Sequence, residues 1–376
     1  MLSGTLVLDL SRLLPGPLAG RILADLGARV VKVEEPSQGD PVRQVKGLGA
    51  LLLSGIESVA LDLKEPGGQE VLGRLLERAD VLLESFRPGT LARLGFSPDL
   101  LRERYPGLVV CSVTGWGQSG PYAARAGHDL TYQAVAGSLA PTAAMPSVPV
   151  ADMVGAWSAT SAILAALLER QRTGRGRHID AALLDAGVHA NLVSWAMEAE
   201  GPKAVGENLP LTGALPCYRL YRTADGRLLA LGALEPHFWS RFCDAAGCPD
   251  LRRRQYSDSA RVRRRVEAVV RGRTVAEWMD LFAKEDIPAE PVLSAAEARN
   301  HPQVRERGML SSEEGDRIGY PALVDGIRPR AGAHVPALGE HTDAWLGELG
   351  ISRKGKGIGR RFSWKRLLRR ALQRGS

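Results

Sequence analysis

The order of apolar and polar positions predicts alternating strands and helices in the first third of the chain. Residues 6–10 form a short apolar run, apolar residues recur at helical spacing over 18–26, and 30–34 form a second apolar run. The alternation continues with predicted strands at 58–63, 81–83 and 108–113 and a predicted helix at 66–78. Because strands that alternate with helices are typical of a parallel sheet, we expect an α/β fold with a Rossmann-like large domain.

A different pattern begins after residue 205. Glycine and proline residues in 206–216 predict a linker, and the turn sequence Thr-Ala-Asp-Gly, between apolar runs at 217–222 and 227–231, predicts a β-hairpin. A basic helix is predicted at 260–271. A second helix is predicted at 274–284, where Thr274 and Glu277 have the spacing of a capping box. These patterns divide the chain into a large α/β domain at 1–205, the linker at 206–216, a small α+β domain at 217–300, a return to the large domain at 301–351 and a tail at 352–376.

The composition is that of an ordinary folded protein, with 44% hydrophobic and 24% charged residues. It excludes a disordered chain, a collagen-like fibre and a small disulfide scaffold. We find neither an apolar stretch typical of a membrane span nor a secretory signal at the N-terminus. The cysteines (Cys111, Cys217, Cys243, Cys248) form no CxxC pair and have no histidine at metal spacing. We therefore expect free thiols, a cytoplasmic location and no metal site.

The net charge of +7 is concentrated in the tail. Of the 49 lysines and arginines, ten lie in 352–376, which has no acidic residue; the 39 that remain face 42 acidic residues, a net charge of −3. The body of the protein is thus mildly acidic, and we expect no nucleic-acid partner. Apolar residues of the tail recur at helical spacing, at Trp364, Leu367, Leu368, Ala371 and Leu372. Such a basic amphipathic helix could lie on an anionic surface, although a solvated tail is the plainer interpretation.

The candidate chemistry lies in two segments. A glycine-rich loop at 114–121 follows a predicted strand and leads to His128, a position where open α/β sheets bind ligands. Asp152 begins a long helix of small and apolar residues at 152–170, and we expect the helix dipole there to favour its ionised form. Taken alone, each segment also fits a plainer interpretation: an ordinary turn with a surface histidine, and a simple helix cap. The turn at 14–20 lacks the dinucleotide fingerprint G-x-G-x-x-G, so a nicotinamide cofactor is not predicted.

Further motifs, taken in order from about residue 4 to residue 345, give these segments a context. They are Leu13-x-Pro15-Gly16-Pro17, Gly39-Asp40-Pro41-x-Arg43, Leu61-Asp62-Leu63-Lys64, Phe86-Arg87-Pro88-Gly89, Thr114-Gly115-Trp116-Gly117, Thr173-Gly174-x-Gly176 and Leu338-Gly339-Glu340-His341-Thr342. With these motifs the chain resembles the class III coenzyme A transferases and their racemase relatives. Within that family it is most similar to the α-methylacyl-CoA racemases, on Gly127-His128-Asp129-x-x-Tyr132, on Tyr221-x-Thr223-Ala224-Asp225-Gly226 and on the segment from Gly232 to Phe238.

The resemblance implies roles for particular residues. His128 and Asp152 would be the catalytic pair, and Glu235 a supporting acid. Residues that would bind the coenzyme A part of the substrate are Leu61, Asp62, Leu63, Lys64, Arg87, Gly127, Asp129 and Tyr132. The family likeness also implies an interlocked homodimer, in which Glu235 would approach His128 and Asp152 of the partner subunit. Coenzyme A would enter only as part of an acyl-CoA substrate, with no separate cofactor.

The implied reaction is inversion of C2 in 2-methyl-branched acyl-CoA thioesters. One base cannot reach both faces of a planar enolate, so two opposed acid–base groups are expected, and a histidine with a carboxylate suits this. Backbone N–H groups at the start of the Asp152 helix are expected to stabilise the enolate oxygen.

A transferase is the alternative, because the matching aspartate in those relatives is a nucleophile that carries coenzyme A as an aspartyl thioester. His128 favours the racemase. Glu35 favours the transferase, since it stands where the racemases tend to carry a coenzyme-contacting arginine.

Overall fold

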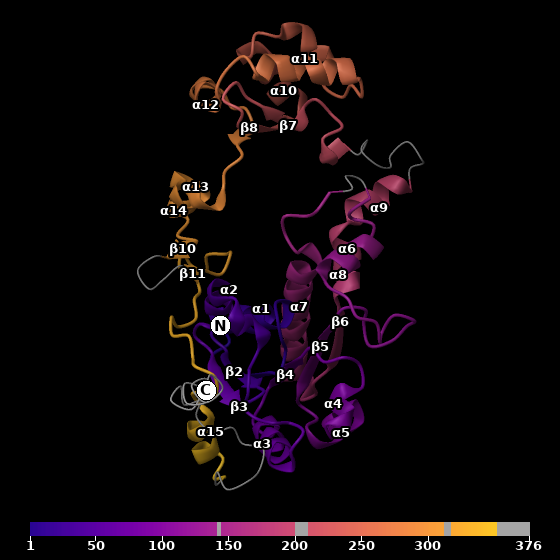
Figure 1. Ribbon diagram of the computed structural model, residues 1–376, viewed down its shortest axis with the longest axis vertical. Helices are drawn as coiled ribbons and strands as arrows, with labels where there is room; N and C mark the ends of the chain where they lie inside the picture. Colours follow the sequence, from indigo (N-terminus) through magenta and orange to yellow (C-terminus); the bar gives the residue numbers. More distant parts are fainter. Residues whose placement is uncertain (141–143, 200–209, 312–316, 352–376) are drawn as a thin grey trace, which may run out of the picture. The chain divides into compact units, whose positions relative to one another are not determined.

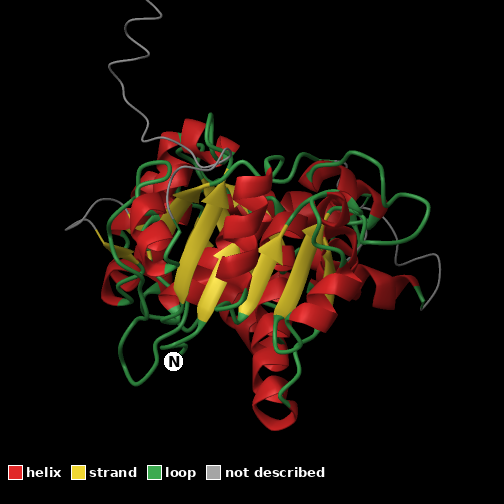
Figure 2. Ribbon diagram, turned by 90° about the horizontal axis from the view of Figure 1, so that it is seen from below, coloured by secondary structure: helices red, strands yellow, loops and turns green. Residues whose placement is uncertain are grey.

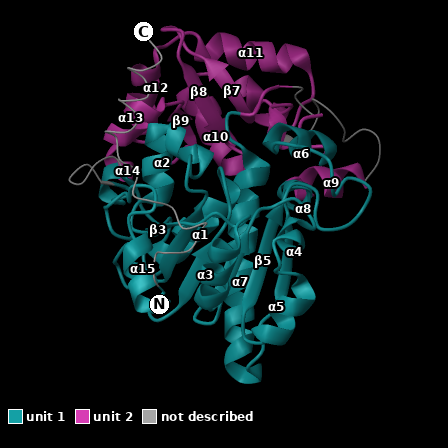
Figure 3. Cartoon of the chain, turned by 60° about the horizontal axis from the view of Figure 1, so that its bottom comes forward, with its two compact units in different colours: residues 1–136, 147–190, 305–376 teal, residues 137–146, 191–304 magenta. Residues whose placement is uncertain are grey.

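The computed structural model describes residues 1–140, 144–199, 210–311 and 317–351. The predicted basic tail, 352–376, and residues 206–209 of the predicted linker lie outside the described residues. The chain forms two compact units (Figure 3). Unit 1 consists of Met1–Ala136, Ser147–Ala190 and the described residues from Arg305 onward, and unit 2 consists of the described residues of Gly137–Pro146 and Asn191–Val304. The predicted small domain, 217–300, lies within unit 2, which begins earlier in the chain.

Unit 1 is built on a six-stranded parallel sheet (Figures 1 and 2). Its strands are β1 (Leu6–Asp9), β2 (Arg29–Glu34), β3 (Glu57–Ala60), β4 (Val81–Glu84), β5 (Val109–Thr114) and β6 (His178–Ala182). They are arranged in the order β3-β2-β1-β4-β5-β6, and every neighbouring pair is parallel. This confirms the predicted α/β fold with a Rossmann-like sheet.

Helices cover both faces of this sheet (Figure 2). They are α1 (Pro15–Asp25), α2 (Lys46–Leu53), α3 (Pro66–Leu76), α4 (Thr90–Arg93), α5 (Pro98–Arg104), α6 (Asp129–Val135), α7 (Val150–Thr173) and α8 (Leu183–Ala190). Alternate residues of β1 belong to different cores: Val7 packs with α1 and α7, whereas Leu6 and Leu8 pack with α3. The continuous apolar runs of the sequence thus reflect strands that are buried on both faces.

The C-terminal part of the chain returns to unit 1 and completes its second core. It contributes a small two-stranded sheet, β10 (Leu310–Ser311) with β11 (Arg317–Ile318), and the helix α15 (Thr342–Glu348). Trp345 is buried beside the sheet, and its indole N–H donates to Glu57 Oε2 at 2.5 Å. The Thr342 hydroxyl accepts the backbone N–H of Ala60 at 3.0 Å. The edge strand β3 is therefore covered by a helix from the other end of the sequence.

Unit 2 has an antiparallel sheet of β7 (Tyr218–Arg222), β8 (Leu228–Gly232) and β9 (Ala289–Pro291). Its helices are α9 (Leu192–Glu198), α10 (Pro236–Ala245), α11 (Ala260–Val270), α12 (Val275–Phe282) and α13 (Ala295–Asn300), and α14 (Pro302–Glu306) spans the boundary with unit 1. The predicted hairpin is confirmed by the antiparallel pairing of β7 with β8. The predicted capping box is also confirmed, since Thr274 N–H donates to Glu277 Oε2 at 2.7 Å and Glu277 N–H to Thr274 Oγ1 at 3.3 Å.

The longest helix, α7, is apolar enough by length and composition to cross a membrane. Its small residues, however, are buried against α1, α8 and β5 in the first core of unit 1. It thus serves as the central helix of that core. The four cysteines are buried, and none forms a disulfide.

The glycines of the motif at 173–176 are explained by the turn between α7 and β6. Gly174 ends α7 with φ +70°, and a Cβ at Gly176 would lie 1.9 Å from the carbonyl oxygen of Leu108. We predict that Gly176→Ala lowers the free energy of unfolding by about 1–3 kcal/mol, because a backbone group cannot move aside as a side chain can. Gly47→Ala is the control, since a Cβ there meets no atom within 4 Å. Chemical denaturation of both variants measures the difference, and equal stability would contradict the prediction.

Candidate active site

A cavity of about 540 Å³ lies in unit 1 at the carboxyl ends of three neighbouring strands. Its walls come from residues 12–15 after β1, 85–88 after β4 and 113–116 at the end of β5. The order of the strands reverses between β1 and β4: β2 and β3 are added on one side of β1, whereas β4, β5 and β6 are added on its other side. Open α/β sheets bind ligands at this switch point. We call this cavity the pocket.

The pocket combines an apolar lining with positive charge. Three arginines, Arg12, Arg87 and Arg125, are among its lining residues. Among the described residues that line it, Asp152 is the one carboxylate, and His128 is the one histidine. Guanidinium groups pair well with phosphates and carboxylates, so the lining suits an anionic ligand with an apolar part.

The glycine loop after β5 closes around Tyr132. A Cβ at Gly115 would lie 2.2 Å from the Tyr132 hydroxyl oxygen, and one at Gly127 would lie 2.5 Å from the Tyr132 ring. Trp116 meets the same ring edge-to-face, with centroids 4.9 Å apart. Glycine is therefore required at 115 and 127 so that the backbone can pass close to the buried tyrosine.

Asp129 brings the two candidate catalytic residues to one place. One of its carboxylate oxygens, Oδ1, accepts the backbone N–H of Asp152 at 3.1 Å, and Oδ2 accepts from the Gln133 side chain at 2.5 Å. Asp129 begins α6 directly after His128, and Asp152 lies in the first turn of α7. The bond thus ties the starts of α6 and α7 together, with His128 and Asp152 lining the same pocket.

The ionisation of Asp152 differs from the expectation drawn from the helix dipole. Burial, together with the neighbouring charge of Asp129, raises the pKa of Asp152 to about 6. Two of the backbone N–H groups that were expected to stabilise the enolate oxygen already have partners. Asp152 N–H donates to Asp129, and Met153 N–H donates to the carbonyl of Pro149 at 3.0 Å. Desolvation and a like charge therefore outweigh the favourable position at the helix start.

Comparison with known proteins identifies the family. The model of CoA-transferase family III matches residues 2–342. The chain is 36% identical to human alpha-methylacyl-CoA racemase, over 94% of each chain. It is 35% identical to succinate–glutarate CoA-transferase of Agrobacterium fabrum, over 93% of this chain and 95% of the relative. A crystal structure of a CaiB/BaiF family protein from Brucella suis superposes with a TM-score of 0.80 at 28% identity, covering 93% and 99% of the two chains.

The chain belongs to CoA-transferase family III. This confirms the family inferred from the sequence motifs. A racemase and a transferase stand at nearly equal identity among the relatives, so the level of identity favours neither reaction.

The other residues predicted for this member of CoA-transferase family III lie in three places. Arg87, Gly127 and Tyr132 line the pocket, with Asp129 behind it. The segment Leu61, Asp62, Leu63 and Lys64 follows β3 and is not part of the pocket lining; the Leu61 side chain is buried in the core and Lys64 is exposed. Glu235 belongs to unit 2, where it is exposed at the start of α10.

Sequence reasoning missed two of the arginines. Arg12 follows β1 and Arg125 precedes Gly127, and both line the pocket. The position of Arg12 directly after a buried strand was a signal that could have found it, because the same rule pointed to the loop after β5. Within the described residues, no three His, Cys, Asp or Glu side chains gather as a metal ion would require.

The raised pKa of Asp152 predicts a cost in stability. Above pH 6 the folded state must hold an ionised, partly buried carboxylate, and this cost disappears as the pH falls toward the usual aspartate pKa of 3.8. We predict that Asp152→Asn raises the free energy of unfolding by about 1–2 kcal/mol near neutral pH, because one pKa unit corresponds to about 1.4 kcal/mol and solvent screens part of the effect.

The measurement is urea denaturation at several pH values, and the gain of the Asn variant should shrink as the pH approaches about 4. Asp99→Asn is the matched control, since Asp99 also lies in the first turn of a helix but its side chain is 93% exposed. A loss of stability in Asp152→Asn at neutral pH would show that the burial of this carboxylate is not costly.

Proposed function

We propose that this enzyme inverts the configuration at C2 of 2-methyl-branched acyl-CoA thioesters by two-base proton transfer through an enolate. The observation that carries the proposal is that His128 and Asp152, from the starts of two different helices, line one pocket. A histidine and a carboxylate can divide the work, because one removes the C2 proton and the other returns a proton to the opposite face. Their roles exchange with the hand of the substrate.

The electrostatics of the site support this role for Asp152. A carboxyl group with a pKa of about 6 accepts and releases protons near neutral pH, as a group that alternates between base and acid must do. Arg12, Arg87 and Arg125 suit the phosphates of a coenzyme A thioester, whose charges do not react. Binding energy gained on the coenzyme part can hold C2 between the two acid–base groups. On this proposal coenzyme A is part of the substrate and not a separate cofactor.

The proposal includes Glu235 and a second copy of the chain. By resemblance to the racemases, Glu235 would be a supporting acid, and the enzyme would work as an interlocked homodimer. The exposed position of Glu235 at the start of α10 leaves its carboxylate accessible to a partner subunit.

A transferase is the second candidate: transferases also stand among the relatives, and Glu35 is the residue of this chain that favours it. The Glu35 carboxylate accepts from the backbone N–H groups of Ser37 and Gln38 at 3.0 and 3.1 Å. Partial burial alone would raise the pKa of Glu35, but these bonds and the bond from the Ser37 hydroxyl outweigh burial and lower the pKa. The position that the racemases tend to fill with an arginine is thus held here by an ionised acid.

In the transferase reaction, the Asp152 carboxylate would attack the thioester carbonyl, and the C–S bond would break to give a mixed anhydride and the coenzyme A thiolate. The thiolate would then attack the Asp152 acyl carbon and release the donor carboxylate, leaving an aspartyl thioester. An acceptor carboxylate would take coenzyme A by the reverse steps.

The deciding experiment is incubation of a single-handed 2-methylacyl-CoA in heavy water. We predict deuterium at C2 together with loss of optical purity. His128→Ala should slow this exchange by at least about a hundredfold, because one of the two acid–base groups is gone. His334→Ala is the control, since His334 pairs with Glu340 and does not line the pocket. Passage of coenzyme A to an added carboxylic acid without exchange at C2 would refute the racemase and establish the transferase.

The pKa of Asp152 also predicts a pH dependence. For the substrate hand that requires Asp152 as the base, kcat/KM should fall below pH 6, as the carboxylate takes up its proton. Asp129→Asn should move this acidic limb to lower pH, because it removes the like charge that raises the pKa while it keeps an acceptor oxygen for the Asp152 N–H. The measurement is the pH profile of kcat/KM for both enzymes, and an unchanged limb would show that Asp129 does not tune Asp152.

A further inference from the structure

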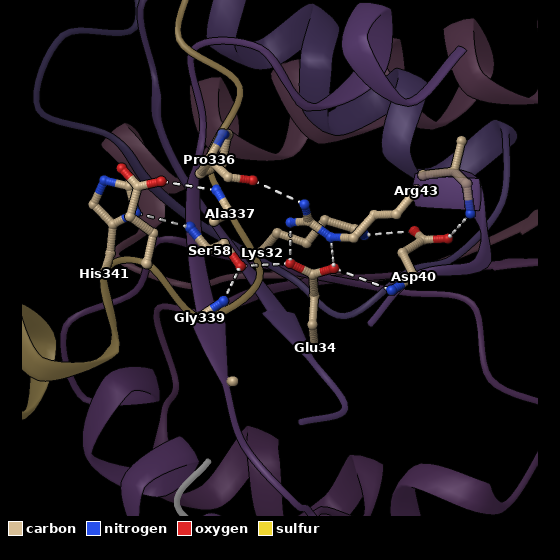
Figure 4. Close-up of polar contacts among 12 residues, drawn as sticks. Lys32, Glu34, Asp40, Arg43, Ser58, Pro336, Ala337, Gly339 and His341 are labelled. Atoms are coloured by element: carbon tan, nitrogen blue, oxygen red, sulfur yellow. Dashed lines mark hydrogen bonds and ion pairs between the residues drawn. The ribbon is translucent and has the colours of Figure 1, made fainter. Parts of the chain in front are cut away.

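Two motifs that served only to recognise the family, 39–43 and 338–342, meet in one buried polar cluster (Figure 4). Its centre is Glu34, at the end of β2. Glu34 Oε1 accepts the backbone N–H of Asp40 at 3.0 Å and Arg43 Nε at 2.7 Å. Glu34 Oε2 accepts Arg43 Nη2 and the Ser58 hydroxyl, both at 2.6 Å. The chain that follows β2 is thereby held against β3.

The return segment closes the other side of this cluster. Arg43 Nη1 donates to the carbonyl of Pro336 at 2.8 Å, and Gly339 N–H donates to the Ser58 hydroxyl oxygen at 2.9 Å. The backbone N–H of Ser58 donates to His341 Nδ1 at 3.3 Å. Figure 4 shows these contacts as one continuous set around Glu34. The return segment thus bonds to the loop that carries Arg43 through Pro336, and to β3 through Gly339 and His341.

Lys32 connects the cluster to the strand beside it. Its side chain is fully buried, and Nζ donates to the carbonyl of Ser11 at 2.6 Å. The same nitrogen pairs with Asp9 Oδ2 at 3.2 Å and with Asp40 Oδ2 at 3.1 Å. Burial alone would lower the pKa of Lys32, but the surrounding carboxylates outweigh it and raise the pKa. The ammonium group therefore stays charged and holds Asp40 in place.

The second oxygen of Asp40 reaches the wall of the pocket. Asp40 Oδ1 accepts the backbone N–H of Leu13 and that of Val42, each at 3.0 Å. Both of these residues line the pocket. Leu13 has φ +69°, a left-handed conformation that a leucine rarely adopts, and its side chain remains 47% exposed. A strained backbone of this kind persists only where its surroundings enforce it.

We propose that Asp40 is a positioning residue for the acyl-CoA pocket: it holds Leu13 in the left-handed conformation that shapes the pocket wall. The inference rests on the proposed function only in that acyl-CoA occupies this pocket. Without the Asp40 carboxylate, the Leu13 backbone relaxes to negative φ and the wall between β1 and the pocket changes shape. Asp40 itself does not line the pocket and acts through the backbone of Leu13.

Binding is measured with the decyl thioether of coenzyme A, which cannot react by either mechanism, by isothermal titration calorimetry. Asp40→Ala should weaken binding at least tenfold. Asp40→Asn keeps an acceptor for both N–H groups and should weaken binding no more than threefold. Asp25→Ala is the matched control: Asp25 is also buried and ion-paired, with Arg21, and accepts the N–H of Ala331, but neither partner lines the pocket. Its effect should stay below threefold.

A double-mutant cycle separates positioning from a general effect on folding. Glycine adopts positive φ without strain, so in the Leu13→Gly background the further change Asp40→Ala should cost less than threefold in affinity. An equal loss in both backgrounds would overturn the proposal.

A crystal structure of the unliganded Asp40→Ala variant gives a test that needs no ligand. If the Ala variant does not fold, the structure of the Asp40→Asn variant is determined instead. We expect negative φ at Leu13 in the Ala variant and positive φ in the Asn variant. A left-handed Leu13 in the Ala variant, or a relaxed Leu13 in the Asn variant, refutes the positioning role. If the wild-type enzyme does not bind the thioether while these conformations are as expected, the proposed function fails and the positioning role stands.

Discussion

The ammonium group of Lys32 lies out of contact with water in unit 1, and three acceptors surround it: the carboxylates of Asp9 and Asp40 and the carbonyl of Ser11. Removing one partner of a buried ion pair typically costs about 3–5 kcal/mol, because the remaining charge is left without solvation. The three acceptors come from the end of β1, the loop after it and the loop after β2. One desolvated charge therefore fixes the edge of the sheet where the order of the strands reverses. On this side of the pocket, the loops after β1 and β2 are therefore tied together by ionic contacts as well as by apolar packing.

At Asp152, in contrast to Lys32, the neighbouring charge opposes ionisation. Asp152 occupies a position that helix electrostatics favour for an anion, yet burial and Asp129 raise its pKa to about 6. Asp129 stabilises the start of α7 through the backbone of Asp152 while its charge opposes the ionisation of that residue's side chain. Perturbed acids of this kind cluster at functional sites, because a group that exchanges protons near neutral pH must not be fully stabilised in either form. A carboxylate at this position is also compatible with the nucleophilic role of the transferase alternative.

The two halves of the chain contribute differently to this site. The N-terminal half supplies the lining residues, whereas the return segment acts from behind, through Gly339, His341 and Pro336 on the Glu34 cluster and through Trp345 on β3. The motif at 338–342 therefore supports this site without lining the pocket. It acts through intermediates: Gly339 N–H donates to the Ser58 hydroxyl, and that hydroxyl in turn donates to the buried carboxylate of Glu34.

The sequence by itself determined the α/β fold, the first five strands of the sheet, the hairpin and capping box of unit 2, and the family. It also singled out His128 and Asp152, which line one pocket. Each of these depends on local signals: apolar runs, turn residues, helix-start residues and motif spacing. It did not reveal β6 (His178–Ala182), a half-exposed edge strand in which polar His178 and Asp180 interrupt the apolar residues. It also did not reveal the burial that raises the pKa of Asp152, and it missed Arg12 and Arg125 in the pocket. Only the tertiary structure decided these features, because burial, the charge of Asp129 and the neighbours of Lys32 come from residues that are brought together by folding. The helix dipole could be read from the sequence, whereas the desolvation that outweighs it could not.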